Sequence, residues 1–275
     1  MIKSLSKNEV NEFIREIQVY GFCHAKQLIK PSQKKLLSMV KKYYKEGSME
    51  TRMFKGLPKR DIKDLRVYNL PNKNKIFVDL ITNNQIEKIL KPLINDKYYR
   101  FLPDTVPNYI LNSFSARSSG YALDYHIDSN IPFQGNFPIS ILVLFVLEDM
   151  NEKNGATVVV PGSHQSGKYT DRELKNVKII KAKAGDVLFL DSRTWHGAKE
   201  NKTKKSRWLI NALFSQWWLK QQIDLVNSIP SKIFKKLSNK QKQILGFCSI
   251  PPKSELDRIN TKCGYNFLKT FLKNS

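Results

Sequence analysis

The sequence has few cysteines, and none of them has the spacing that binds zinc or builds a disulfide framework. Cys23, Cys248 and Cys263 are odd in number and far apart, and no Cys-x-x-Cys occurs. Neither a zinc knuckle nor a disulfide-stabilised scaffold is therefore indicated. A chain of this kind fits a reducing compartment, so we predict a cytoplasmic location.

Long apolar runs are also absent. The longest uninterrupted run covers residues 141–147, whereas a membrane-spanning helix needs about 20 apolar residues. Met1 leads directly into an amphipathic pattern, without the apolar region of a signal peptide. We therefore expect no membrane span and no secretory signal. The sequence also contains no internal repeat and no glycine-rich phosphate-binding loop.

Acidic residues are scarce, with 24 Asp and Glu against 47 Lys and Arg and a net charge of +23. Residues 1–100 carry 22 basic and 10 acidic side chains and residues 199–275 carry 16 and 4, but residues 101–198 carry 9 and 10. Such a charge is compatible with nucleic-acid binding, yet lysines in helical patterns usually form solvated faces. We do not expect nucleic acid to be the main partner. The other interpretation is a basic rim that attracts an anionic substrate or a substrate linked to a carrier that bears phosphates.

The first 97 residues follow a helical period. Ser6 and Glu9 have the spacing of a capping box, which predicts a helix start. The expected elements are a helix from Ser6 to Gly21, a strand over 22–25, a helix from Pro31 to Gly47, a loop over 48–64 and a third helix within 76–94. A loop of that length in a compact domain is a candidate lid over a substrate.

From residue 98 the period changes to that of β-strands. We expect strands over 98–102, 108–111, 121–126, 139–147, 157–160, 177–182, 186–190 and 207–217. Such a run of short strands after helices favours an antiparallel sandwich or barrel with added helices. We therefore predict one domain over 1–275, with a helical part at 1–97, a β core at 98–218 and a helical extension at 219–275.

A histidine and a carboxylate lie two positions apart in His126-Ile127-Asp128. In an extended strand these two side chains point to the same side. A second stretch, residues 185–197, reads as an apolar strand that leads to His196. Two histidines and one carboxylate with open positions form the facial triad of non-haem iron(II) oxygenases. We therefore predict a catalytic iron site made of His126, Asp128 and His196.

The combination of these motifs resembles the phytanoyl-CoA dioxygenase family of Fe(II)- and 2-oxoglutarate-dependent oxygenases. The matching positions are His126-Ile127-Asp128, residues 154–164, Gly185-Asp186, Trp195-His196-Gly197, Asn201 and Arg207. The resemblance is strong over residues 105–217. It implies a mainly β fold with flanking helices (α+β), whose core is a double-stranded β-helix, a cupin-like jelly-roll. The three predicted ligands match the family's iron ligands.

By the same resemblance, Arg207 matches the arginine that holds the far carboxylate of 2-oxoglutarate. A guanidinium group suits this role because it binds a carboxylate through two hydrogen bonds and stays charged. The alternative is a surface arginine in the basic run 202–207. Ala198 stands where some members have a hydroxyl residue, so a helper hydrogen bond is absent or comes from elsewhere. Thr157 and Asn112 are the candidates for it, and either fits equally well as a structural strand residue.

The resemblance implies a hydroxylase that uses Fe(II), 2-oxoglutarate and O2 on a small-molecule substrate and releases succinate and CO2. Asp128 supports hydroxylation, because related halogenating enzymes carry a small residue at its position. We interpret His164, in a Pro-Gly-Ser-His turn, as structural. Three alternatives remain open: a jelly-roll protein without catalysis, a zinc or manganese enzyme with the same ligands, and a basic protein that acts on nucleic acid or nucleotides.

Overall fold

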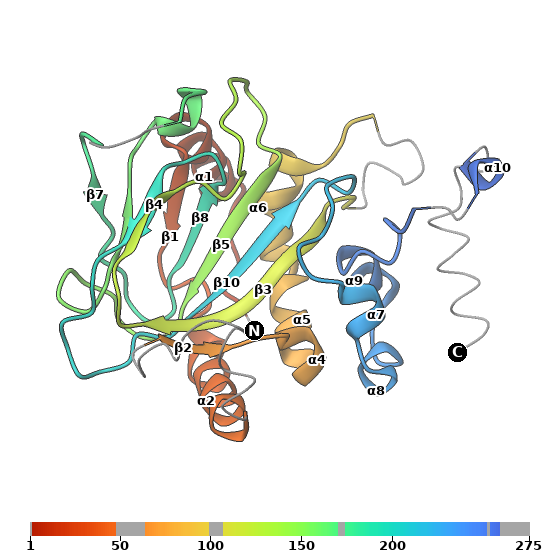
Figure 1. The fold of residues 1–275 in the computed structure, drawn as a ribbon, viewed down its shortest axis with the longest axis horizontal. Coiled ribbons are helices and arrows are strands. Elements are labelled where there is room, and N and C mark those ends of the chain that lie inside the picture. The colour runs from red at the N-terminus through yellow and green to blue at the C-terminus, as the bar shows by residue number, and fades with distance from the viewer. Residues whose placement is uncertain (1, 48–63, 99–106, 170–173, 252–253, 259–275) are drawn as a thin grey trace.

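The protein is built from two β-sheets that face each other, with helices on the outer side of the larger sheet (Figure 1). The computed structural model describes residues 2–47, 64–98, 107–169, 174–251 and 254–258. Within them, the larger sheet has the order β1-β8-β5-β10-β3-β2 and the smaller β4-β9-β6-β7. All of these neighbours pair antiparallel. The predicted mainly β fold with a double-stranded β-helix core is confirmed.

The strands agree with most of the expected segments. They are β1 Phe22–Ala25, β2 Asp64–Val67, β3 Ile110–Ser119, β4 Leu123–His126, β5 Ser140–Val146, β6 Thr157–Val159, β7 Lys178–Ile179, β8 Val187–Asp191, β9 His196–Ala198 and β10 Leu209–Ser215. The strand expected over 108–111 was placed wrongly at its end, because it continues through a serine-rich stretch to Ser119. Pairing with β10 on one side and β2 on the other supplies its backbone hydrogen bonds despite the weak β-propensity.

The N-terminal helices are α1 Lys7–Tyr20, α2 Lys30–Glu46, α4 Leu70–Lys73, α5 Lys75–Ile81 and α6 Asn84–Ile94. The capping box predicted for α1 is present, since Ser6 accepts from the amide of Glu9 and Glu9 accepts from that of Ser6. The amphipathic helix expected within 76–94 is present as α6, but the preceding helix α5 was not predicted. Asn83 has an extended backbone, and its side-chain oxygen accepts a hydrogen bond from the amide of Gln85, which caps the start of α6. The chain therefore forms two helices, one on each side of Asn83.

The C-terminal part is helical, as expected, but its helices are short. They are α7 Leu225–Ser228, α8 Ser231–Phe234, α9 Asn239–Ile244 and α10 Glu255–Arg258, and a 3-10 turn, η1 Ser163–Gln165, lies between β6 and β7. The expected loop over 48–64 lies outside the described residues apart from Asp64, which begins β2. The strand expected over 98–102 lies outside them apart from residue 98, and so do residues 259–275 of the extension.

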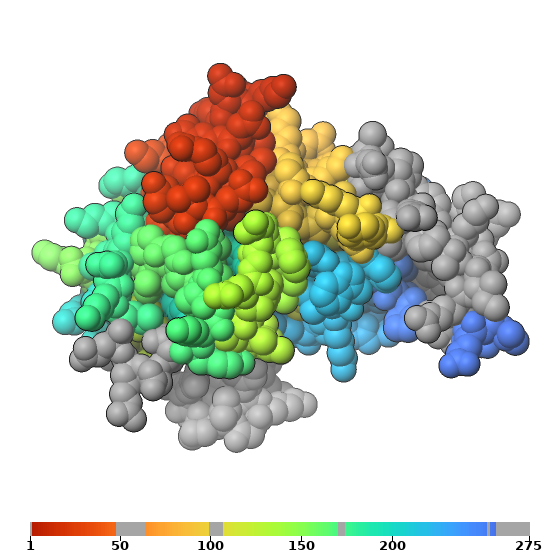
Figure 2. Space-filling view, turned by 90° about the horizontal axis from the view of Figure 1, so that it is seen from above, coloured from red at the N-terminus to blue at the C-terminus, as the bar shows by residue number. Residues whose placement is uncertain are grey.

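Side chains on the central strands point alternately to the two faces of the larger sheet, and each face has its own apolar layer. On β5, Ile141, Val143 and Phe145 face the helices, whereas Leu142 and Leu144 face the smaller sheet. Seen from above, α1 lies beside the segment 64–98, in agreement with the packing of α1 on α6 (Figure 2). Because helices and sheets share these layers, we propose that residues 1–275 form one domain.

No helix among the described residues is long and apolar enough to cross a membrane.

Candidate metal centre

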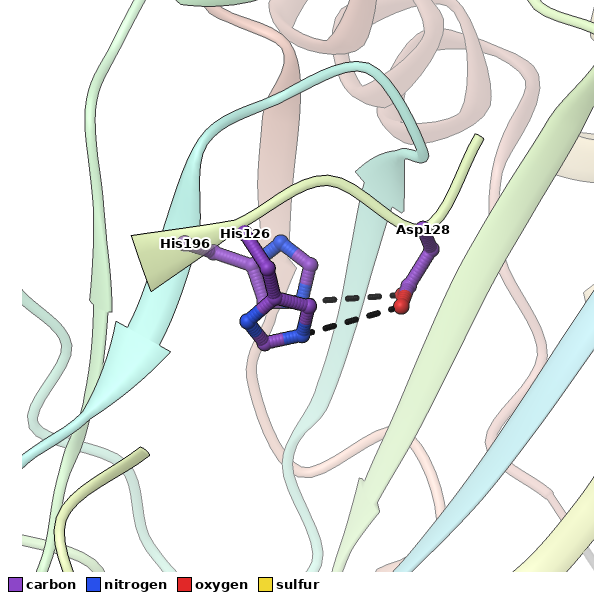
Figure 3. A group of neighbouring side chains, drawn as sticks. All are labelled: His126, Asp128 and His196. Atoms are coloured by element: carbon purple, nitrogen blue, oxygen red, sulfur yellow. Dashed lines mark ion pairs between the residues drawn. The ribbon is translucent and has the colours of Figure 1, made fainter. Parts of the chain in front are cut away.

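The two predicted histidine ligands lie opposite each other on neighbouring strands. β4 and β9 pair antiparallel, and their register places His126 against His196, with ring centroids 4.3 Å apart. Asp128 follows β4 and points its carboxylate at both rings (Figure 3). Its Oδ1 lies 3.7 Å from Nε2 of His126 and its Oδ2 lies 3.6 Å from Nε2 of His196. The structure thus brings together the three residues of the predicted triad as a group that can hold one metal ion.

Each ring is oriented by a hydrogen bond to the main chain. Nδ1 of His126 donates to the carbonyl of Asp124 over 2.8 Å, and Nδ1 of His196 donates to that of Thr194 over 2.9 Å. Because a carbonyl only accepts, the proton lies on Nδ1 in both rings. The lone pair of each Nε2 therefore faces Asp128, which is the tautomer that a divalent metal requires.

Burial favours the uncharged form of the inner histidine. His196 is only 4% exposed, and this burial lowers its pKa from the ordinary value. The charge of Asp128 acts in the opposite direction and the neighbouring His126 acts in the same direction. A neutral imidazole is the form that binds a metal, so metal binding does not have to displace a proton from His196 at neutral pH.

The backbone of Asp128 is held by the turn before His196. The amides of Asp128 and Ser129 both donate to the carbonyl of Ser192, over 2.8 and 3.1 Å. The hydroxyl of Ser140 on β5 donates to Oγ of Ser192 over 2.6 Å. The backbone of Asp128 is therefore fixed relative to the larger sheet and to the turn that leads to His196.

A cavity of about 260 Å³ opens beside the triad, between the two sheets. Part of its wall is apolar, formed by Leu142, Leu144, Leu209 and Leu213. The remaining lining residues are Ser113, Arg117, Ser119, Leu123, His126, Asp128, Thr157, His196, Gly197, Ala198, Arg207, Asn211 and Gln222. The cavity thus brings the triad together with polar side chains that include a guanidinium group.

Arg207 lies in this cavity and is 4% exposed. Among the described residues no carboxylate pairs with it, its Nε has no hydrogen-bond partner, and its Nη1 has only the sulfur of Met150 at 3.6 Å. Burial lowers its pKa to about 10, and the charge of Arg117 adds to this effect, so Arg207 is still a cation at neutral pH. A buried cation without a counter-ion is unfavourable unless an anionic ligand joins it. Arg207 is therefore not the surface arginine of the alternative interpretation.

Of the other two predicted cofactor-binding residues, Thr157 lines the cavity and Asn112 does not. Thr157 on β6 lines the cavity and lies opposite Ala198 in the register of β6 and β9. Asn112 is not among the lining residues. Its Nδ2 donates to the hydroxyl of Ser215 and the carbonyl of Lys220, and its Oδ1 accepts from the amide of Gln222. Asn112 thus anchors the segment after β10, which brings Gln222 to the cavity.

Sequence reasoning missed the polar residues that β3 turns into the cavity, namely Ser113, Arg117 and Ser119. The signal was the alternation in residues 113–119, in which these side chains lie on one face and Phe114 and Ala116 on the other. A polar inner face on a strand of a two-sheet core indicates a ligand cavity. His164 lies outside this cavity and bonds through Nε2 to the carbonyl of Gln18 over 3.1 Å, in agreement with a structural role.

Comparisons with known proteins agree with this arrangement. A family profile described as Phytanoyl-CoA dioxygenase (PhyH) matches residues 5–208. "Uncharacterized protein Rv1501" of Mycobacterium tuberculosis is 30% identical over 144 residues, which are 51% of this chain and 53% of that protein. "Dioxygenase af480" of Aspergillus fumigatus is 24% identical over 193 residues, 68% of this chain and 60% of that protein. The chain thus spans about half the length of the first relative and 60% of the second.

A solved structure with the same fold is that of HygX from Streptomyces hygroscopicus, determined with nickel, 2-oxoglutarate and hygromycin B bound. Its TM-score is 0.61 at 15% sequence identity, and the match covers 79% of this chain and 90% of HygX. At 15% identity, this similarity shows that the two proteins share the double-stranded β-helix fold.

Proposed function

The chain belongs to the phytanoyl-CoA dioxygenase family, and on this basis we propose that it is an Fe(II)- and 2-oxoglutarate-dependent dioxygenase that hydroxylates a small molecule. The observation that carries the proposal is the buried cation of Arg207, which has no carboxylate partner among the described residues and lies in the same cavity as the triad His126, Asp128 and His196. A metal site alone fits several enzyme classes. A metal site with a buried guanidinium beside it fits a cosubstrate that has both a metal-binding end and an anionic end.

The three side chains of the triad are the proposed iron ligands. Two imidazoles and one carboxylate suit iron(II), and they leave positions open for other ligands. The carbonyls of Asp124 and Thr194 hold the rings in the required tautomer, and the carbonyl of Ser192 holds Asp128. In this proposal the chain itself orients the ligands, because the groups that hold them belong to the protein backbone.

Arg207 is the proposed partner of the far carboxylate of 2-oxoglutarate. A guanidinium can form two parallel hydrogen bonds with a carboxylate, and burial strengthens them. When iron and 2-oxoglutarate are bound, the chemistry they supply converts 2-oxoglutarate and O2 into succinate and CO2 while one oxygen atom of O2 enters a C–H bond of the substrate. The apolar wall of Leu142, Leu144 and Leu209 limits the access of water to the reacting groups.

A cavity of about 260 Å³ supports a small-molecule substrate rather than a macromolecular one. HygX, which shares the fold, was solved with nickel, 2-oxoglutarate and hygromycin B bound. On the same inner face of the larger sheet, Ser113 and Asn211 offer neutral hydrogen-bonding groups beside the leucines of the apolar wall, and Gln222, from the segment after β10, offers another. We propose that these groups bind polar parts of the substrate.

The proposal is tested by anaerobic titration of Fe(II)-loaded protein with 2-oxoglutarate. The wild type should develop the weak visible charge-transfer band of an iron-bound 2-oxo acid. His196→Ala should lose the band because it loses iron, and Arg207→Gln should retain iron but require at least ten times more 2-oxoglutarate. Arg15→Gln, at an exposed position of α1, is the matched control and should behave as the wild type. Iron binding without any band in the wild type would disprove the cosubstrate assignment.

A further inference from the structure

A second arginine, Arg117, lines the cavity that contains the triad and Arg207. It lies on β3, on the same inward face as Ser113 and Ser119. Two arginines in one cavity of about 260 Å³ need an explanation, because like charges at close range repel each other.

The strand register places both arginines at the same end of the cavity. Arg117 lies opposite Leu209 in the pairing of β3 with β10. Arg207 comes just before β10, and its amide donates to the hydroxyl of Ser118 on β3 over 2.8 Å. Ser113 lies opposite Leu213 at the other end of the paired strands. Both arginines therefore lie toward one end of the cavity, and Ser113 lies toward the other.

Arg117 is held in place by two side chains. Its Nε lies 3.3 Å from Oδ1 of Asp64, and its Nη2 donates to the hydroxyl of Ser119 over 3.0 Å. Asp64 belongs to β2 and also pairs with Arg66, whose Nε lies 2.9 Å from Oδ2. Arg66 lies opposite Arg117 in the register of β2 and β3 but does not line the cavity. The short strand β2 thus orients the side chain of Arg117 through Asp64.

The electrostatic relation between the two arginines points to an anion. Burial and the charge of Arg117 together lower the pKa of Arg207 to about 10. An anion at this end of the cavity would interact favourably with both cations and remove their mutual repulsion. A carboxylate has two oxygens and several lone pairs, so it can accept from both guanidinium groups at once.

We propose that Arg117 is a second residue of the subsite for the far carboxylate of 2-oxoglutarate, so that arginines from β3 and β10 hold this group together. The inference rests on the proposed function, because it concerns the same cosubstrate. It adds that β2, through Asp64, positions one of the binding residues. It also predicts that selectivity for a 2-oxo acid with a distal carboxylate depends on Arg117.

The test is anaerobic titration of Fe(II)-loaded protein with two probes that differ only at the far end. 2-Oxoglutarate carries the distal carboxylate, whereas 2-oxovalerate has a methyl group in its place. Arg117→Gln should weaken binding of 2-oxoglutarate at least ten-fold and leave the weaker binding of 2-oxovalerate within two-fold of the wild type. Arg117→Lys, which keeps the charge, should lose less than Arg117→Gln.

Arg66→Gln is the matched control, because Arg66 shares Asp64 with Arg117, carries the same charge and lies outside the cavity. It should bind 2-oxoglutarate within two-fold of the wild type. Two results would overturn the inference and leave the proposed function standing. One is that Arg117→Gln and Arg66→Gln lose the same affinity for 2-oxoglutarate. The other is that Arg117→Gln loses the same affinity for 2-oxoglutarate and for 2-oxovalerate. Absence of 2-oxoglutarate binding in the wild type would overturn both the inference and the proposed function. If Arg117→Gln does not fold, the affinities of Arg117→Lys and Arg66→Lys for 2-oxoglutarate are compared instead. The inference predicts a loss of affinity in Arg117→Lys only, and equal affinities would overturn it.

Discussion

Asp191 and Arg193 form a bidentate ion pair inside the protein, with side chains only 2% and 3% exposed. Nη2 of Arg193 lies 2.7 Å from Oδ2 and its Nε lies 3.0 Å from Oδ1. Nη1 of Arg193 donates to the carbonyl of Gly135 over 2.8 Å, and the guanidinium lies 4.5 Å from the ring centroid of Phe133. The pair thus connects the turn before His196 to the segment that follows Asp128.

Replacing Arg193 by Met should destabilise the protein strongly. The substitution leaves the carboxylate of Asp191 buried and unpaired and removes the donor to Gly135, so we expect a loss of about 3–5 kcal/mol in the free energy of unfolding. Urea unfolding of the metal-free protein measures it. Lys183→Met breaks the exposed pair with Asp149 and should leave the unfolding midpoint nearly unchanged. Similar midpoints for the two variants would contradict this role of the buried pair.

Each of the three substitutions His126→Ala, Asp128→Ala and His196→Ala should abolish stoichiometric iron binding, because two ligands hold a divalent metal much more weakly than three. Anaerobic calorimetry with Fe(II), or with Ni(II) as a stable substitute, measures the stoichiometry. His164→Gln is the control, since His164 is as buried as His196 but lies outside the cavity. Loss of metal in His164→Gln together with full binding in His126→Ala would place the metal elsewhere.

The grouping of His126, Asp128, His196 and Arg207 around one cavity was predictable because their signals are local or lie at family-like spacings. His126 and Asp128 lie two positions apart where β4 ends, and His196 follows the apolar strand β8 and begins β9. Arg117 was not predicted because its role depends on the register of β3 with β10, which brings it beside Arg207. Asn112 was predicted as a cofactor-binding residue, but the bulge between Leu213 and Phe214 shifts the pairing on either side of it. Its amide bonds to the segment after β10 instead.

Arg207→Met should stabilise the metal-free protein. Removing a buried cation that has no carboxylate partner among the described residues relieves the desolvation that lowers the pKa of Arg207 to about 10. We expect a gain of roughly 1–3 kcal/mol in the free energy of unfolding, measured by urea denaturation. The same variant should lose the increase in Tm that 2-oxoglutarate gives to the iron-loaded wild type. A less stable Arg207→Met protein would show that the cation contributes to folding rather than to ligand binding.

Asp186 should make the stability of the protein sensitive to acid. Burial alone would raise the pKa of Asp186, but hydrogen bonds from His24, from the amides of Lys183 and Gln27 and from the Gln27 side chain lower it to about 2. Because the folded pKa lies below the unfolded value of about 4, this carboxylate contributes about 2 kcal/mol above pH 4. The contribution disappears as the pH falls from about 4 to about 2. Asp186→Asn should flatten the pH dependence of urea unfolding in this range, and an unchanged slope would assign it to other carboxylates.

Gly197→Ala should weaken metal binding without touching a ligand. A Cβ at position 197 would lie 2.5 Å from the carbonyl oxygen of Leu123 on β4, and this oxygen belongs to the backbone, so it cannot move aside alone. β4 and β9 would have to separate, which would shift His126 away from His196. We expect at least a ten-fold weaker affinity for Ni(II) in calorimetry. Ala198→Gly, at the next position of β9, introduces no such contact and should bind metal as the wild type does. Equal affinities in Gly197→Ala and the wild type would mean that the spacing of the two strands is not what sets the geometry of the triad.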